Sequence, residues 1–298
     1  MSSDKPSATV AKISPTTWEP TPFTSSAVAF RPQELVISLV GEYVEPGGRV
    51  WSGGLVQLLD CLGFTTPGAR VALNRLVSRG LFDVVKDGRK VFYTATARLV
   101  ELLNEGHQQT FWFRYSQKPW RGDWTLVWYT IPEEQLLKRR RLSRRLVFLG
   151  FGALQDGTWL APHDRSEELW TAVEDLQLRD YVVVVVGAAP AWASRQTMIR
   201  RAWNVDEASA RYTAIVEGFR QFSNRRVLAT VTPERAFIVR THLIEAIRQV
   251  APLDPKLPDA DTGFRWHRRL ALEVFKDVDA ALQPMASEFF NEKTRPHS

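Results

Sequence analysis

Apolar residues recur at helical spacing in three short segments of the first third of the chain. The first segment runs from Gln33 to the helix breaker Pro46-Gly47-Gly48, and the second begins at Ser52, which we expect to cap it. The third follows Thr65 and Thr66, either of which can supply the cap. The spacing predicts three helices with the core positions Leu35, Val36, Leu39, Val40, Tyr43, Leu55, Leu58, Leu59, Ala69, Ala72, Leu73, Leu76 and Val77.

Two strand-like runs follow the third helix, at residues 81–85 and 90–94. The turn Lys86-Asp87-Gly88-Arg89 joins them as a hairpin, and a fourth helix is expected over residues 96–105. Three helices and a hairpin are the elements of a winged helix-turn-helix, which we place at residues 33–106. In that fold one helix enters the major groove of DNA and the hairpin reaches the flanking backbone.

The third helix has an outward face whose chemistry suits base pairs. Arginine pairs with guanine, asparagine pairs with adenine, and a small apolar side chain contacts the methyl group of thymine. No acidic residue lies between Thr65 and Phe82, and the hairpin adds cations for phosphate. An ordinary solvated surface, or a winged helix that binds protein, would carry similar residues. The candidate DNA-binding residues are Thr65, Thr66, Arg70, Val71, Asn74, Arg75, Ser78, Lys86, Arg89 and Lys90.

The pattern changes at about residue 120 to an alternation of strands and helices that extends to residue 190. We expect strands at 124–130, 153–154, 157–160 and 181–186, and helices at 133–149 and 166–176. This βαββαβ order is ferredoxin-like. Its first helix carries the densest positive run, residues 138–145, which either contacts DNA or forms the solvated face of an amphipathic helix. The apolar stripe that favours the second interpretation is Leu136, Leu137, Leu142, Leu146 and Leu149.

Residues 191–298 are predicted to be helical, with helices at 195–203, 206–222, 233–250 and 262–290. Pro284 is expected to break or kink the last of them. We assign effector sensing and dimerisation to this part. The Ser/Thr/Pro-rich segment 1–32 is predicted to be a disordered tail, and residues 107–119 an aromatic linker that packs between domains.

Composition narrows the class of protein. The 39 Lys and Arg exceed the 33 Asp and Glu, which gives a net charge of +6 that suits a polyanionic partner. The single cysteine, Cys61, excludes a disulfide framework and multi-cysteine metal sites, and it is expected to be a small core residue. Neither a bilayer-spanning apolar run nor a signal-peptide core is present. We expect a cytoplasmic protein without a metal or cofactor.

With these units in place, the chain resembles the PaaX family of bacterial repressors, which are named for the control of phenylacetic acid degradation. The similarity covers about residues 33–290. The segments that carry it, in order, are Gly41-Glu-Tyr-Val-Glu-Pro-Gly-Gly-Arg-Val-Trp51, Gly68-Ala-Arg-Val-Ala-Leu-Asn-Arg-Leu-Val-Ser-Arg-Gly-Leu81, Trp124-Thr-Leu-Val-Trp-Tyr-Thr-Ile-Pro-Glu133 with Leu149-Gly-Phe-Gly152 and Gly157-Thr-Trp159, Trp203-Asn-Val-Asp206 with Arg211-Tyr212, and Leu253-Asp-Pro-Lys-Leu-Pro258.

The resemblance implies a repressor with an N-terminal winged helix, a central ferredoxin-like domain similar to that of a CRISPR-associated nuclease, and a helical C-terminal domain. It also implies a homodimer on a palindromic operator. In the founding group, phenylacetyl-coenzyme A releases the repressor from DNA.

This chain departs from the family at two places. The first central strand of the family commonly ends in Tyr-Asp-Ile-Pro, whereas here Thr130 stands where the nuclease relatives place a metal-binding aspartate. Threonine is a poor ligand for a hard cation, so the nuclease chemistry loses its best candidate residue. In addition, Glu245-Ala246-Ile247-Arg248 replaces a His-Glu-aromatic-Arg stretch, which suggests a different effector if that stretch forms the effector site or a domain interface.

The sequence therefore predicts an α+β DNA-binding repressor of a catabolic operon, not an enzyme, which binds double-stranded operator DNA as a homodimer. A small molecule, an aromatic acid or its coenzyme A thioester, is expected to release it by favouring a geometry that mis-spaces the recognition helices. A nuclease built on the ferredoxin-like domain is the alternative, and a winged-helix module without DNA is a third. The candidate effector residues, chosen near the expected domain junction, are Trp159, Trp192, Trp203, Arg211, Tyr212 and His242, of which the histidine has a purely structural alternative.

Overall fold

The computed structural model describes residues 31–104, 120–257, 262 and 265–296. Within them the chain forms two small antiparallel sheets and many helices, so the fold class is α+β. The predicted tail up to residue 30 and the predicted aromatic linker lie outside the described residues. None of the helices in the described ranges is long and apolar enough to cross a membrane.

The N-terminal part contains the three predicted helices and the hairpin. Nearly all the predicted core positions are buried; Tyr43 and Val77 are half-buried. Thr65 caps the third helix, because its Oγ1 accepts a hydrogen bond from the Gly68 N–H at 3.3 Å. The elements are α2 (Pro32–Tyr43), β1 (Arg49–Trp51), α3 (Ser52–Cys61), α4 (Thr66–Ser78), β2 (Phe82–Asp87), β3 (Lys90–Ala95) and a helix that begins at residue 97.

Three local details differ from the sequence prediction. β1 is an additional strand, which pairs antiparallel with β3 through Val50 and Tyr93. The predicted cap at Ser52 is wrong, since the chain enters α3 directly from β1 and Ser52 is already helical. The hairpin turn is shorter than expected, because Gly88 adopts a φ of 58° and the strands extend to within two residues of each other.

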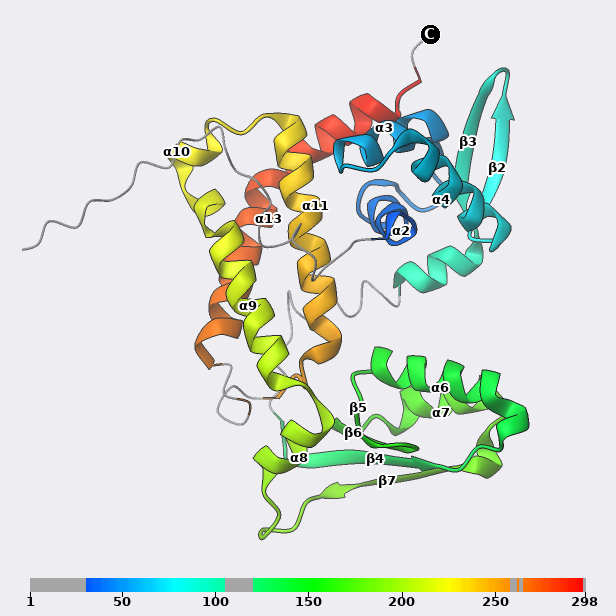
Figure 1. The fold of residues 1–298 in the computed structure, drawn as a ribbon, viewed down its shortest axis with the longest axis vertical. Helices are drawn as coiled ribbons and strands as arrows, with labels where there is room; N and C mark the ends of the chain where they lie inside the picture. Colours follow the sequence, from blue (N-terminus) through cyan, green and yellow to red (C-terminus); the bar gives the residue numbers. More distant parts are fainter. Residues whose placement is uncertain (1–30, 105–119, 258–261, 263–264, 297–298) are drawn as a thin grey trace, which may run out of the picture.

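The central part is a four-stranded antiparallel sheet with the strand order β5-β6-β4-β7. Its elements alternate in the order that the sequence predicts, and α6 and α7 cover one face of the sheet (Figure 1). Val127 and Tyr129 point into the core beneath these helices, whereas Trp128 faces the opposite side. The elements are β4 (Asp123–Tyr129), α6 (Leu136–Phe148), β5 (Gly152–Gln155), β6 (Thr158–Pro162), α7 (Ser166–Asp175) and β7 (Val182–Ala188).

The predicted apolar stripe of α6 is only partly correct. Leu142 and Leu146 are buried and Leu149 is half-buried. Leu136 and Leu137 are exposed, the latter by 72%. The reason is that residues 133–135 form a 3₁₀ turn, so α6 begins only at Leu136 and its first turn lies beyond the sheet.

The C-terminal part consists of helices, three of which are long and pack side by side (Figure 1). Of the break or kink predicted at Pro284, the break is wrong, since the last helix continues through this proline. Its flanking residues Leu282 and Ala286 are fully buried, and this packing outweighs the lost hydrogen bond. The helices are α8 (Arg195–Ala202), α9 (Val205–Phe219), α10 (Arg225–Leu228), α11 (Pro233–Val250) and α13 (Arg265–Thr294).

One apolar core continues from the N-terminal helices into α9, α11 and α13. The ring of Tyr43 on α2 stacks on Phe290 of α13, with 4.7 Å between the ring centroids. Gly54 of α3 lies so close to α13 that an added Cβ would be 2.4 Å from the carbonyl oxygen of Lys293. The N-terminal helices are therefore packed directly against the C-terminal ones.

Candidate nucleic-acid interface

The outward face of α4 carries the side chains that the sequence predicts for it. Arg70, Val71, Asn74, Arg75 and Ser78 are all exposed, while the alternate face of the helix is buried. The Ser78 hydroxyl donates to the backbone carbonyl of Asn74 at 3.0 Å, so it satisfies a local acceptor. The remaining four side chains form a surface with two cations and one amide group.

A groove of about 600 Å³ separates α4 from α3 and the hairpin. Arg70 and Asn74 line its α4 side, and Tyr93 lines the hairpin side. Gln57 of α3 also borders the groove, with an amide that the sequence reasoning missed. The one signal for Gln57 in the sequence was its place between the apolar core positions Leu55 and Leu58, which puts it on the exposed side of α3.

The hairpin tip adjoins the C-terminal end of α13. A cavity of about 660 Å³ between them is lined by the predicted cations Arg89 and Lys90 and by two further arginines, Arg49 and Arg295. Arg49 is 3.8 Å from the carboxylate of Asp87, the single acidic residue of this lining. Lys86 is exposed but does not line the cavity. No sequence pattern joins Arg295 to the hairpin, since only the packing of α13 on α3 brings it there.

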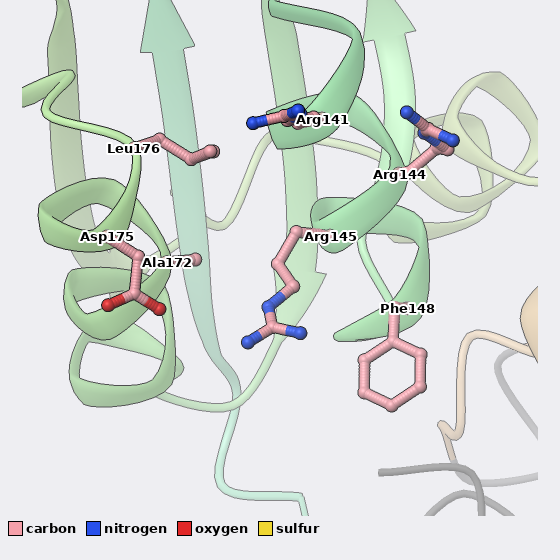
Figure 2. Close-up of a pocket in the computed structure, with 7 residues that line it drawn as sticks. All are labelled: Arg141, Arg144, Arg145, Phe148, Ala172, Asp175 and Leu176. Carbon is pink, nitrogen blue, oxygen red and sulfur yellow. The ribbon is translucent and has the colours of Figure 1, made fainter. Parts of the chain in front are cut away.

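The basic helix α6 places four of its five arginines in two environments. Arg139 is hydrogen-bonded to Asp156 and lowers the pKa of that carboxyl group. Arg141, Arg144 and Arg145 instead line a cavity of about 330 Å³ between α6 and α7, shown in Figure 2. The cavity also has apolar walls, which Phe148 and Leu176 provide.

The structure does not bring the six candidate effector residues into one site. Trp192 is 87% exposed, and Trp159 donates from Nε1 to the hydroxyl of Tyr129 at 3.3 Å. None of the six lines any of the three cavities described above.

The other four of these residues lie in the packed C-terminal part. Trp203 is buried, and Arg211 is bonded to Glu207 at 2.7 Å. The Tyr212 hydroxyl donates to Asp254 at 2.6 Å. His242 is buried with its Nδ1 2.7 Å from the carbonyl oxygen of Ile238, and burial lowers its pKa.

The nuclease alternative requires metal ligands or a nucleophile, and the described residues give little support for either. Thr130 is exposed just after β4, and its N–H donates to the carbonyl oxygen of Tyr181 at 3.1 Å. Across the residues that the structure describes, no three His, Cys, Asp or Glu side chains are grouped to hold a metal ion. Cys61 is half-buried at the end of α3, and burial raises the pKa of its thiol, which disfavours the nucleophilic thiolate.

The stretch that departs from the family pattern lies against α2. Glu245 accepts a hydrogen bond from the Ser38 hydroxyl, and both groups are buried. Arg248 is 3.9 Å from Glu42 of the same helix. Glu245-Ala246-Ile247-Arg248 is therefore part of the contact between the C-terminal helices and the DNA-binding candidate.

Comparison with known proteins identifies all three parts. Residues 31–99 match the PaaX-like protein family, residues 117–199 its central Cas2-like domain, and residues 203–292 its C-terminal domain. The chain is 28% identical over 274 residues to the transcriptional repressor PaaX of Escherichia coli, which covers 90% of this chain and 85% of the relative.

The solved structure of the uncharacterized protein Rv0674 from Mycobacterium tuberculosis shows a similar fold, with a TM-score of 0.50, 18% identity, and coverage of 89% of this chain and 99% of the other. With matches in consecutive order over most of its length, the chain belongs to the PaaX-like family.

Proposed function

We propose that the protein is a transcriptional repressor that binds double-stranded operator DNA through a winged helix-turn-helix made by α2, α3, α4 and the β2–β3 hairpin. The observation that carries this proposal is the outward face of α4, where exposed Arg70 and Asn74 border a groove shared with the hairpin. A helix with this face fits the major groove, in which arginine and asparagine each make bidentate contacts to one purine. The similarity to a repressor over 90% of the chain supports the same assignment.

The phosphate contacts come from the hairpin and its neighbours. Lys86, Arg89 and Lys90 lie at or near the tip, and Arg49 and Arg295 extend the positive surface to the end of α13. Cations of this kind position the protein on DNA without selecting a sequence. Since α13 belongs to the C-terminal part, the winged-helix part and the C-terminal part both contribute to the same DNA surface.

The protein acts as a homodimer, and the open face of the central sheet is its interface. The central part has the strand order of a ferredoxin-like domain, with β7 at an edge that no other described strand covers. Trp128, Val183 and Val185 are 57%, 52% and 56% exposed on the face opposite α6 and α7, and register pairs Trp128 with Val183. An apolar patch on an uncovered edge strand is typical of a surface that pairs with another chain. A second copy fits, because a palindromic operator requires two identical recognition helices.

A small molecule regulates the DNA complex. An aromatic acid or its coenzyme A thioester would favour a dimer geometry in which the two copies of α4 are wrongly spaced. The protein is not an enzyme in this proposal. The exposed Thr130 at the strand end, where a nuclease would need a carboxylate, supports a binding function over a hydrolytic one.

The DNA proposal is tested with fragmented genomic DNA of the organism that carries the chain. The purified protein should enrich a small set of fragments, and its affinity for them should fall linearly with salt on a double-logarithmic plot. Equal recovery of all fragments, with an affinity independent of salt, would favour the third alternative of a winged helix that binds protein. Cleavage of the fragments by the highly purified protein would favour the nuclease.

The dimer is tested by Val185→Lys, which places a cation in the middle of the patch. Sedimentation should show a mass near the 34.0 kDa of one chain for this variant and twice that value for the wild type. Leu137→Lys, at a leucine on α6 that is even more exposed than Val185, is the matched control and should remain dimeric. A dimer that survives Val185→Lys would place the interface elsewhere.

A further inference from the structure

The cavity between α6 and α7 combines two properties that a solvated helix surface does not need. It is lined by three arginines, Arg141, Arg144 and Arg145, and by a single acidic residue, Asp175. Within the described part of the chain, neither Arg141 nor Arg144 forms an ion pair with an acidic side chain. The site therefore keeps an excess of positive charge beside a concave surface.

Part of the wall of the same cavity is apolar. Phe148 closes one end, and Leu176 follows α7 on the opposite side. In Figure 2, Arg141 and Arg145 project from α6 toward the space in front of Leu176 and Asp175. An anion held by these arginines would place the rest of its molecule against the Phe148 and Leu176 side chains.

The volume limits what can enter. At about 330 Å³ the cavity lies near the lower end of the range for small-molecule sites, roughly 300–1,000 Å³. One or two fused rings with an attached acid group fill such a space, whereas a nucleotide would extend beyond it. Guanidinium groups bind carboxylates and phosphates through paired hydrogen bonds, and they also stack on aromatic rings.

We propose that this cavity binds a small molecule in which an aromatic ring is joined to an anionic group. The arginines hold the anion, and the ring packs between Phe148 and Leu176. The carboxylate of Asp175 repels the anion and so fixes the direction in which the ligand enters. As the place where an effector binds, the site rests on the proposed repressor function; as a binding site, it can be tested without DNA.

The cavity is also well placed to influence the rest of the protein. Phe148 ends α6, and four residues later the chain reaches Gly152, where an added Cβ would be 2.5 Å from the carbonyl oxygen of Ala202. The loop after α6 therefore packs tightly on the C-terminal helices. A ligand that moves Phe148 acts on a contact with no free space.

The probe is 2-naphthoate, titrated into the full-length protein by calorimetry. Wild type should bind one molecule per chain. Arg141→Gln should raise the Kd about tenfold, because it removes one charge-assisted hydrogen bond. Asp175→Asn should lower the Kd severalfold, because it removes a like charge. Arg140→Gln is the matched control, an exposed arginine of the same helix outside the cavity, and should change the Kd by less than about twofold.

Three further ligands separate the chemistry of the ring from that of the anion. The uncharged 2-naphthylmethanol and inorganic phosphate should each bind at least about tenfold more weakly than 2-naphthoate. The thioester 2-naphthoyl-coenzyme A, whose nucleotide extends beyond the cavity, should bind more weakly than 2-naphthoate, and tighter binding of the thioester would refute a carboxylate held by the cavity arginines.

The proposal is overturned if 2-naphthoate does not bind, or if Arg140→Gln weakens binding as much as Arg141→Gln does. It is also overturned if phosphate binds as tightly as 2-naphthoate, or if Arg141→Gln leaves ligand binding intact and instead weakens every DNA duplex. Because the titrations contain no DNA, a failure of DNA binding by the wild type would refute the repressor function while leaving the ligand site standing.

Discussion

Arg240 of α11 donates from Nη2 to Oε2 of Glu42 on α2, at 3.0 Å, and this ion pair joins the C-terminal helices to the DNA-binding candidate. The Nε of the same guanidinium donates to Asp279 of α13 at 2.8 Å. Burial lowers the pKa of Arg240, but Tyr43 and the two carboxylates outweigh it, so the guanidinium stays charged. A buried charge of the C-terminal part therefore helps to hold α2, on which α4 packs, in place.

Arg240→Ala should therefore lower the free energy of unfolding by about 3–5 kcal/mol, because it removes the buried guanidinium that pairs with the carboxylates of Glu42 and Asp279. Urea denaturation measures the change. Arg269→Ala is the control, since its pair with Glu273 at 3.7 Å is exposed, and should cost less than about 1 kcal/mol. An equal loss of unfolding free energy in the two variants would show that the buried ion pairs stabilise the fold no more than the exposed one does.

The contact between α3 and α13 gives a second prediction. Gly54→Ala would place a Cβ 2.4 Å from the backbone oxygen of Lys293, so the two helices must separate. We expect a loss of about 1–3 kcal/mol in thermal or urea unfolding, as for other overpacked cores. Gly187→Ala has nothing within 4 Å of the new Cβ and should be nearly neutral. If Gly54→Ala were as stable as Gly187→Ala, the close packing of α3 on α13 would be refuted.

Glu245 gives a prediction for pH. Burial raises the pKa of its carboxyl group, although Arg248 and the Ser38 hydroxyl oppose the shift. The folded state then binds more protons than the unfolded state above the ordinary value of 4.5, so this group's contribution to stability is lost as the pH rises through that window.

Glu245→Gln keeps an oxygen that accepts from Ser38 but does not titrate. The stability of the wild type relative to this variant should therefore decrease as the pH is raised from about 4 toward neutrality. Denaturation curves at several pH values test it. A difference that stayed constant, or that grew in favour of the wild type, would contradict the buried environment of Glu245.

Much of the fold could be predicted from local patterns. The third helix, Thr66–Ser78, was predicted with its cap and both faces, because its apolar spacing and the signals at its ends agree. β1 was missed, since three residues are too short for a periodic signal and pairing with β3 alone defines them. The helix around Pro284 was predicted, but its unbroken course through the proline was not, because burial in the C-terminal core overrides the local preference of proline.

The candidate site divides in the same way. Arg70 and Asn74 could be found because they are the outward positions of one helix. Arg49 and Arg295 could not, because a cavity formed by β1, the hairpin and the end of α13 depends on tertiary packing. The expected effector residues were chosen near a domain junction, yet Tyr212 and His242 are buried in the core that fills it.

DNA binding at varied salt concentration separates the role of α4, which reads bases, from that of the hairpin, which holds phosphates. Fluorescence anisotropy is recorded for an operator duplex and a random duplex of equal length, with wild type, Asn74→Ala and Arg89→Ala, over a series of salt concentrations. Asn74→Ala should weaken operator binding by about 1–3 kcal/mol and leave random DNA unaffected. Arg89→Ala should weaken both duplexes alike and reduce the salt slope by about one unit. Wild-type operator affinity in Asn74→Ala, together with an operator-specific loss in Arg89→Ala, would contradict the account.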